Sequence, residues 1–437
     1  MKKKLHFIGI AAVAGLLLSL SGCSLNINDP NAATNQQVLT NPNGIMALAV
    51  GLQQYYSTSA LGSIILTTGV TTRELAINNT LENLVELEAG ESSLLNNNAN
   101  VTALWSDLYE VIGMCDQIIS NAPNVTLDPG TRSGMMAEAY LFKAMALGNL
   151  AQDFQEAPID ADPSGHAKFV SQSALFVEAI SLLDSASQAI TATPPSSQFN
   201  SQVLGSGFNL PNTIQAYLAR YDLFAGRYQD AINAANAVNP KATSVFSYSS
   251  LSQNPIYQGV FIQARYAARD SLGTPLVESG DQRLSFYLKP DSAFSKPNHY
   301  PIDILAGFFG NATQPIPAYV PGEMPLIKAE AYVELGDLAD AVTQINIVRT
   351  ETPSQDPFGI GASLPAYSGP VTTGALLNEI YYQRCAELYL EGMRLEDSRR
   401  LGRPGPPTST LERNRNYYPY PLQERINNPN TPADPAD

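Results

Sequence analysis

Apolar residues recur every three or four positions over much of this chain, which is the spacing of helices that bury one face. This pattern predicts helices from about Ile45 to Tyr56 and over Val101–Ser120, Met135–Leu150, Ser173–Thr191 and Gly374–Leu401. We expect Asp128-Pro129-Gly130 and the acidic, proline-containing stretch 156–164 to break the chain between helices. The sequence therefore predicts a mainly α protein.

Two segments share one pattern of small residues. Ala219, Gly226 and Ala231 lie in the first, and Ala329, Gly336 and Ala341 lie in the second with identical spacing. A helix, a glycine turn and a second helix entered through alanine are typical of a tetratricopeptide unit, whose small residues let antiparallel helices approach closely. The alternative is chance similarity between alanine-rich helices. We predict tetratricopeptide-like helical repeats, with an insertion between the two copies.

Residues 240–321 lack helical periodicity and are dense in aromatic side chains and prolines. Prolines prevent long helices, and the segment is too apolar to be disordered. It is predicted to be an irregular, loop-rich lobe with short strands that packs on the helical scaffold. N-terminal helical repeats with ligand-side loops would then occupy 44–239, and a C-terminal repeat, a helix and a tail would occupy 322–437.

The amino terminus has the pattern of an export signal. Lysines at positions 2, 3 and 4 precede an apolar run over residues 7–20, which is too short to span a bilayer. Leu20-Ser21-Gly22-Cys23 resembles the lipobox of bacterial lipoproteins, which implies cleavage before Cys23 and acylation of that residue. We therefore expect a signal peptide over 1–22 and a lipidated tether over 23–43, held in a membrane by several acyl chains. The alternative is an ordinary cleaved signal with a chance cysteine.

Charge and residue usage exclude several classes of partner. Removing residues 1–22 takes away three of the 25 Lys and Arg and none of the 40 Asp and Glu, which leaves a net charge of −18. Such an acidic protein should not bind nucleic acid. Cys115 and Cys385 could form one disulfide or stay as buried thiols. His166 and His299 are far apart and lack neighbouring ligands, so we expect no metal or other cofactor.

The segment IYYQRCAELYLEGMRLEDSRRLGR resembles the C-terminal signature of SusD/RagB-type lipoproteins. The matching positions are Arg384, Glu387, Leu388, Glu391, Gly392, Arg394, Asp397 and Arg400. The charged residues recur at three or four positions and could bridge along one helix face. Four further blocks are similar to the family and lie in its order: LWSDLYEVIGMCDQII, AEAYLFKAMALGNLAQDFQEAPI, Gly280–Leu284 and Tyr418–Asn430. Cys115-Asp116 departs from the Ala-Asn that is usual in the family.

This resemblance implies four tetratricopeptide-like units with a loop-rich lobe, on a non-catalytic outer-membrane lipoprotein that faces outside. It implies capture of oligosaccharides or peptides and their delivery to a SusC-type TonB-dependent transporter. Two other functions stay open: a tetratricopeptide scaffold lipoprotein in envelope assembly, and a surface glycan hydrolase with two carboxylates. The chain has no nucleophile elbow, no His-Glu-x-x-His and no phosphate loop, which argues against an enzyme.

Sugars are bound by aromatic faces, with amides and arginines reaching their hydroxyls. We place the ligand site where the amide-rich stretch 73–98 meets the aromatic lobe. The predicted ligand-binding residues are Arg73, Asn78, Asn79, Arg265, Tyr266 and Tyr300. The arginines could fork two hydroxyls or a peptide carboxylate, and the tyrosines could stack on a ligand, so that Tyr266→Ala weakens binding without lowering the melting temperature. Alternatively, Arg73 pairs with Glu74 or Glu82, and both tyrosines are packing residues.

Overall fold

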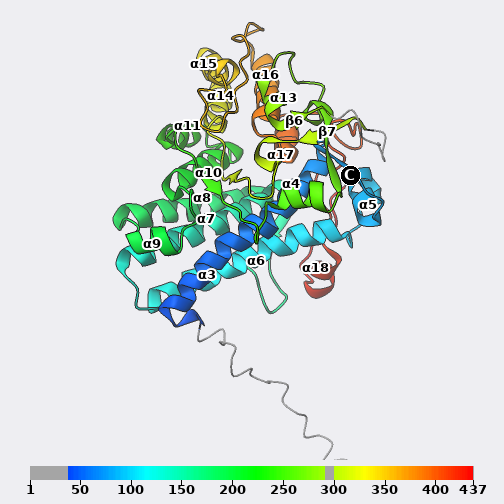
Figure 1. Cartoon of the computed structure of the whole chain (residues 1–437). Coiled ribbons are helices and arrows are strands. Elements are labelled where there is room, and N and C mark those ends of the chain that lie inside the picture. Colours follow the sequence, from blue (N-terminus) through cyan, green and yellow to red (C-terminus); the bar gives the residue numbers. More distant parts are fainter. Residues whose placement is uncertain (1–37, 291–299, 437) are drawn as a thin grey trace, which may run out of the picture. The chain divides into compact units, whose positions relative to one another are not determined.

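The computed structural model describes residues 38–290 and 300–436. The predicted signal peptide, Cys23, most of the tether and His299 lie outside the described residues. The longer helices are α3 (Pro42–Tyr55), α4 (Leu61–Thr71), α6 (Ala99–Asn121), α7 (Pro129–Asp153), α8 (Gln172–Ala192), α10 (Leu210–Phe224), α11 (Tyr228–Ala237), α14 (Glu323–Leu335), α15 (Leu338–Thr350) and α16 (Thr373–Glu387). The shorter ones are α5 (Glu82–Ala89), α9 (Ser197–Gln202), α12 (Pro255–Tyr257), α13 (Gln282–Tyr287), α17 (Arg394–Arg400) and α18 (Leu422–Asn427). The mainly α fold is thus confirmed (Figure 1).

Helices that follow one another along the chain pack side by side, from α6 through α7, α8, α10 and α11 to α14, α15 and α16 (Figure 1). The apolar stripe predicted on α6 is buried from Leu104 to Ile118. The alanines of α7 are fully buried, which lets α6 and α8 pack closely on both sides of it. The core of the molecule therefore lies between the helices of this stack.

The two predicted repeats are the helix pairs α10–α11 and α14–α15. The four alanines of the pattern are fully buried at the contacts between helices. Gly226 and Gly336 end the first helix of each pair with φ of 73° and 86°, a left-handed conformation that favours glycine. Helix α11 packs directly on α14. The chain therefore leaves the helical stack after α11 and rejoins it at the next position with α14.

The segment between the repeats forms an irregular lobe with short strands, as predicted. The strands of the molecule are β1 (Leu75–Ile77), β2 (Glu156–Pro158), β3 (Phe169–Ser171), β4 (Val245–Phe246), β5 (Tyr266–Arg269), β6 (Leu288–Lys289), β7 (Ile302–Leu305) and β8 (Ile316–Pro317). Four of them form an antiparallel sheet in the order β1-β5-β7-β6, and Ile77 lies opposite Tyr266 in it. The lobe sheet thus takes its first strand from the segment after α4.

The helix predicted over Gly374–Leu401 is wrong as one element. The chain breaks between α16 and α17, where Leu390 and Gly392 have φ of 57° and 75°. A Cβ atom on Gly392 would lie 2.7 Å from Cγ2 of Ile64, so the close approach of α4 requires glycine there. Contact with a distant helix therefore sets this break.

Asp128-Pro129-Gly130 begins a helix instead of only breaking the chain. The Asp128 side chain accepts a hydrogen bond from the Thr131 backbone N–H at 3.0 Å, and Pro129 is the first residue of α7. Aspartate at the cap and proline at the first helical position are both favourable there. Helix α7 therefore begins six residues before the predicted Met135.

The signature charges are buried, and the expected bridging along one helix face holds only in part. Arg400 pairs with Asp397 three residues earlier on α17 at 2.7 Å, but the other contacts join separate elements. Arg384 donates to Asp397 at 2.7 Å across the break between α16 and α17, and both side chains are nearly inaccessible to solvent. Arg394 lies 3.5 Å from Glu74, at the end of α4. These residues connect separate elements, which explains why the charged segment is not a solvated surface.

Cys115 and Cys385 are buried free thiols, so the two cysteines form no disulfide. Burial raises the pKa of Cys385 to about 11, which leaves its thiol protonated and unreactive. Within 38–290 and 300–436, no helix combines the length and the apolar character that crossing a bilayer requires.

Candidate ligand-binding site

A cavity of about 500 Å³ lies where the lobe meets the N-terminal ends of the scaffold helices, and we call it the lobe-side cavity. Its lining residues are Thr58, Ser59, Gly62, Ser63, Leu66, Thr67, Asn100, Ala103, Asp107, Gln253, Pro255, Gln258, Gly259, Gln263, Arg265 and Tyr266. Most of these side chains are hydroxyls and amides. The cavity therefore presents both donors and acceptors to a polar, uncharged ligand.

Two π-helical turns border this cavity. The turn η1 (Tyr56–Ala60) connects α3 to α4, and the turn η4 (Gln258–Ile262) follows α12 in the lobe. Thr58 and Ser59 of the first and Gln258 and Gly259 of the second line the space between them. Such turns are uncommon and recur at functional sites, where they re-aim side chains.

Asp107 on α6 is the one carboxylate among the described lining residues. The Tyr55 hydroxyl donates to its Oδ1 at 2.8 Å, and the Ser63 hydroxyl donates to its Oδ2 at 2.5 Å. Burial and this carboxylate raise the pKa of Tyr55, so the phenol stays a donor. Asp107 is thus held in one orientation, where its remaining lone pairs can accept from a ligand. One carboxylate does not supply the pair that glycoside hydrolysis generally uses.

An aromatic pair flanks the cavity-lining residues Gln258 and Gly259, with Tyr257 at the end of α12 and Phe261 on the turn η4. The rings of Tyr257 and Phe261 lie 5.0 Å apart between centroids, with their planes inclined by 34°. Phe261 keeps 37% of its surface exposed. An exposed ring next to amides and hydroxyls is the arrangement that binds the apolar face of a sugar.

The structure brings three of the six predicted residues to this region. Arg265 is exposed and lines the cavity, and Tyr266 lines it with only 6% of its surface exposed. Asn78 lies beside them, because its backbone N–H donates to the Arg265 carbonyl at 2.8 Å. Asn79 is occupied locally, since its side-chain oxygen accepts from the Leu81 N–H at 2.9 Å.

Arg73 and Tyr300 are engaged elsewhere. The Arg73 guanidinium donates to the carbonyls of Thr410 and Glu88, so the expected pairing with Glu74 or Glu82 is not what holds it. The ring of Tyr300 lies under the Arg269 guanidinium, 4.3 Å from it. Neither Arg73 nor Tyr300 lines the lobe-side cavity.

Tyr266 belongs to the hydrophobic core as well as to the cavity wall, as the packing alternative foresaw. Burial raises its pKa to about 12. A Cβ atom on Gly259 would lie 3.2 Å from its ring, so the glycine makes room for it. Truncation of Tyr266 should therefore lower the melting temperature, contrary to the expectation from sequence.

Sequence reasoning missed the hydroxyl residues of η1 and α4, because they lie between the first predicted helix and the amide-rich stretch 73–98, and serine and threonine alone do not indicate a binding site. The Tyr257–Phe261 pair had a signal, since two aromatic residues four apart can stack on one turn. Among the described residues, no group of His, Cys, Asp and Glu side chains could hold a metal ion.

Comparison with known proteins supports one family. The family model described as the SusD family matches residues 309–435. No protein with a curated description matches the sequence. Many solved structures share the fold, and three SusD-type proteins from Bacteroides illustrate it.

A SusD superfamily protein from Bacteroides thetaiotaomicron VPI-5482 superposes with a TM-score of 0.69 at 17% identity, over 90% of this chain and 99% of its own. A SusD superfamily protein from Bacteroides vulgatus ATCC 8482 gives 0.65 at 16% identity, over 88% and 98%. A SusD-like carbohydrate binding protein from the same organism gives 0.64 at 17% identity, over 86% and 85%. Residues 309–435 thus match the SusD family, and over about nine-tenths of its length the chain has the fold of SusD superfamily proteins.

Proposed function

We propose that this protein captures oligosaccharides in the lobe-side cavity. The observation that carries the proposal is a cavity lined by hydroxyls and amides beside the Tyr257–Phe261 pair, of which Phe261 is exposed. Aromatic rings bind the C–H faces of sugars, and the polar side chains bind their hydroxyls. One of the similar structures is a SusD-like carbohydrate binding protein, which favours an oligosaccharide over a peptide. The role is binding without catalysis.

Delivery to a SusC-type TonB-dependent transporter is the second part of the proposal. The lipobox supports an outer-membrane anchor, and the helical stack with its lobe supports a role in binding a partner. Purification of the full chain from solubilised outer membranes tests this role. A SusC-type barrel should co-purify with it. Components of an envelope-assembly machine would support the scaffold alternative instead.

Truncation of the aromatic pair should weaken ligand binding. Phe261→Ala is expected to reduce the affinity for the oligosaccharide that binds best in a calorimetric panel by about 1–3 kcal/mol, because the ring would lose its stacking contact. The melting temperature should stay nearly constant, since Phe261 is 37% exposed. Leu335→Ala is the control, at an exposed apolar residue on α14 far along the chain. Equal affinities of Phe261→Ala and wild type would contradict this site.

Anchoring should depend on one thiol. Cys23→Ala removes the proposed acylation site, so the variant is expected to lose labelled fatty acid and leave the outer-membrane fraction. Metabolic labelling and membrane fractionation measure both effects. A variant that still carries label and sediments with the outer membrane would show that Cys23 is not the anchor.

A further inference from the structure

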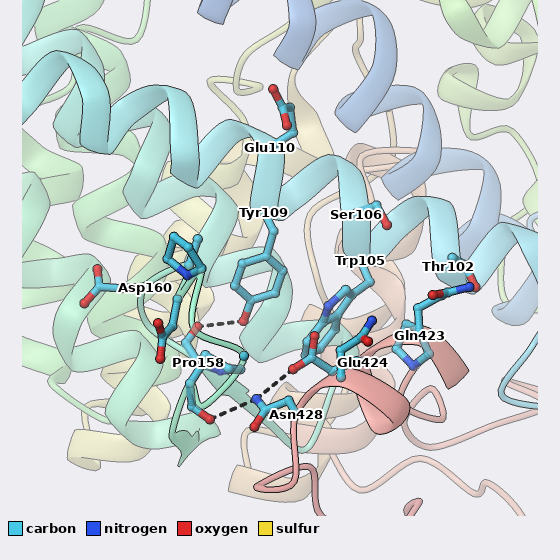
Figure 2. Close-up of a pocket in the computed structure, with 17 residues that line it drawn as sticks. Thr102, Trp105, Ser106, Tyr109, Glu110, Pro158, Asp160, Gln423, Glu424 and Asn428 are labelled. Carbon is cyan, nitrogen blue, oxygen red and sulfur yellow. Dashed lines mark hydrogen bonds between the residues drawn. The ribbon is translucent and has the colours of Figure 1, made fainter. Parts of the chain in front are cut away.

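A second cavity, of about 530 Å³, lies on another face of α6 from the lobe-side cavity, and we call it the tail-side cavity. It is bounded by α6, by the loop between β2 and β3 and by the segment around α18 (Figure 2). Its lining residues are Thr102, Trp105, Ser106, Tyr109, Glu110, Pro158, Asp160, Ala161, Asp162, Pro163, Gly165, Ala167, Pro421, Gln423, Glu424, Asn427 and Asn428. No residue lines both cavities.

The floor of the tail-side cavity is aromatic. Trp105 stacks on Phe169 at 6.0 Å between centroids, and Tyr109 packs against Trp105 at 4.9 Å. The Tyr109 hydroxyl donates to the Pro158 carbonyl at 2.7 Å, which fixes its ring against the loop (Figure 2). Half-buried Tyr109 and the lining prolines offer apolar surface to a ligand.

The walls are fixed by hydrogen bonds between segments far apart in the sequence. Buried Asn428 donates through its side-chain amide to the Ala167 carbonyl at 2.9 Å and to the Glu424 carboxylate at 2.8 Å (Figure 2). A Cβ atom on Gly165 would lie 2.7 Å from the Asn427 carbonyl oxygen, so loop and tail are in close contact. The cavity is therefore preformed, which lowers the entropic cost of binding.

Every charged residue that lines the cavity is acidic: Glu110, Asp160, Asp162 and Glu424. Lys143 neutralises Asp160 by a 2.6 Å ion pair but also binds Asp116. In the described part of the chain, the other three lining carboxylates form no ion pair with a basic side chain. Hydrogen bonds from Ser164 lower the pKa of Asp162, so its charge persists at neutral pH.

The shape of this charge distribution favours an organic cation over a metal ion. No group of acidic side chains in the described residues converges closely enough to coordinate a metal. A protonated amine attached to a ring can instead reach one carboxylate while its apolar face lies on an aromatic side chain. An acidic sugar would be repelled by the same carboxylates.

We propose that the tail-side cavity is a second binding site, which takes a sugar unit that carries a free, protonated amine. The ring of the sugar would lie against Tyr109, and its ammonium group would face Glu424 and Asp162. The site is independent of the lobe-side cavity, and a ligand in one does not require a ligand in the other. It would give the protein affinity for partly or fully deacetylated amino-sugar polymers.

Calorimetry with a glucosamine tetramer and an N-acetylglucosamine tetramer tests the proposal on the full chain. The glucosamine tetramer should bind at least about tenfold more tightly than the N-acetylglucosamine tetramer. Added salt should weaken its binding, because salt screens an exposed charge pair. Glu424→Gln combined with Asp162→Asn should remove most of that preference. Gln keeps an oxygen that can accept from Asn428, so the fold should be retained, and the melting temperature checks this.

Glu334→Gln, at an exposed carboxylate on α14 that lines neither cavity, is the matched control. It should leave the preference for the glucosamine tetramer unchanged, whether or not the lobe-side cavity binds oligosaccharides. Equal affinity for both tetramers, or no effect of the double variant, would overturn the proposal. Tetralysine binding as tightly as the glucosamine tetramer would overturn the assignment to a sugar. If the double variant fails to fold, Asp162→Asn alone, in an exposed loop, should still reduce the preference.

Discussion

Replacing Arg283 by Met is expected to lower the free energy of unfolding by about 3–5 kcal/mol, the typical cost of removing one partner from a buried ion pair. Arg283 donates to Asp281 at 2.6 Å and to Glu387 at 3.1 Å, and all three side chains are at most 2% exposed. It also donates to the side chain of Gln383 at 2.7 Å. The substitution would leave two carboxylates buried without their counter-charge, and it would release the lobe from α16.

Urea denaturation of the purified protein measures this effect. Arg265→Met is the matched control, because Arg265 lies in the same lobe but is exposed, and it should change stability by less than about 0.5 kcal/mol. If Arg283→Met lowers the free energy of unfolding by no more than the control does, the Asp281–Arg283–Glu387 cluster does not hold the lobe on the scaffold.

Glu138→Gln should stabilise the protein at neutral pH. Glu138 lies in α7, is completely buried, and neither of its carboxylate oxygens has a hydrogen-bond partner among the described residues. Burial raises its pKa from 4.5 to about 8. The folded protein therefore keeps a proton that the unfolded chain releases, and folding loses stability as the pH rises from about 4.5 to about 8. At pH 7 the loss is on the order of 3 kcal/mol, and Gln removes it.

Thermal or urea unfolding as a function of pH checks this prediction. Below the unfolded pKa, the variant and the wild type should have similar stability, because the wild-type carboxyl is protonated in both states. The difference in free energy of unfolding between the variant and the wild type should then grow as the pH rises toward 8. Glu334→Gln is the control, since Glu334 is exposed on α14. Parallel pH profiles of Glu138→Gln and wild type would contradict the burial argument.

The sequence predicted the long helices and both repeats because their signals are local. An amphipathic stripe such as Leu104–Ile118 appears in the periodicity, and Gly226 and Gly336 mark turns that need a positive φ. The break between α16 and α17 was missed because its cause is tertiary. It arises where Gly392 meets Ile64 of α4, and no pattern within residues 374–401 reports on α4.

The candidate site was predicted in part. The sequence placed the site where the amide-rich stretch meets the lobe. Arg265 and Tyr266 do line a cavity there, and Asn78 lies beside it. Arg73 does not line the cavity, because its guanidinium donates to two backbone carbonyls. The sequence does not show which backbone groups a side chain will meet. Tyr300 lies just before β7 and packs against Arg269 of β5, and that contact depends on how the two strands pair.

The turn η1 sets the rotational phase between α3 and α4. Counted along one continuous α-helix at about 100° per residue, the buried residues Ile64, Ile65 and Thr68 would point about 105° away from the buried face of α3. A π turn takes up one extra residue and reduces this difference to about 5°. Both helices can therefore bury their apolar faces against α6. Deleting one residue from Tyr56–Ala60 would rotate α4 by about 100°. Because nine of the eleven residues of α4 are buried, the rotation would disrupt its contacts on nearly every side, so this wall of the cavity should tolerate substitution but not a change of length.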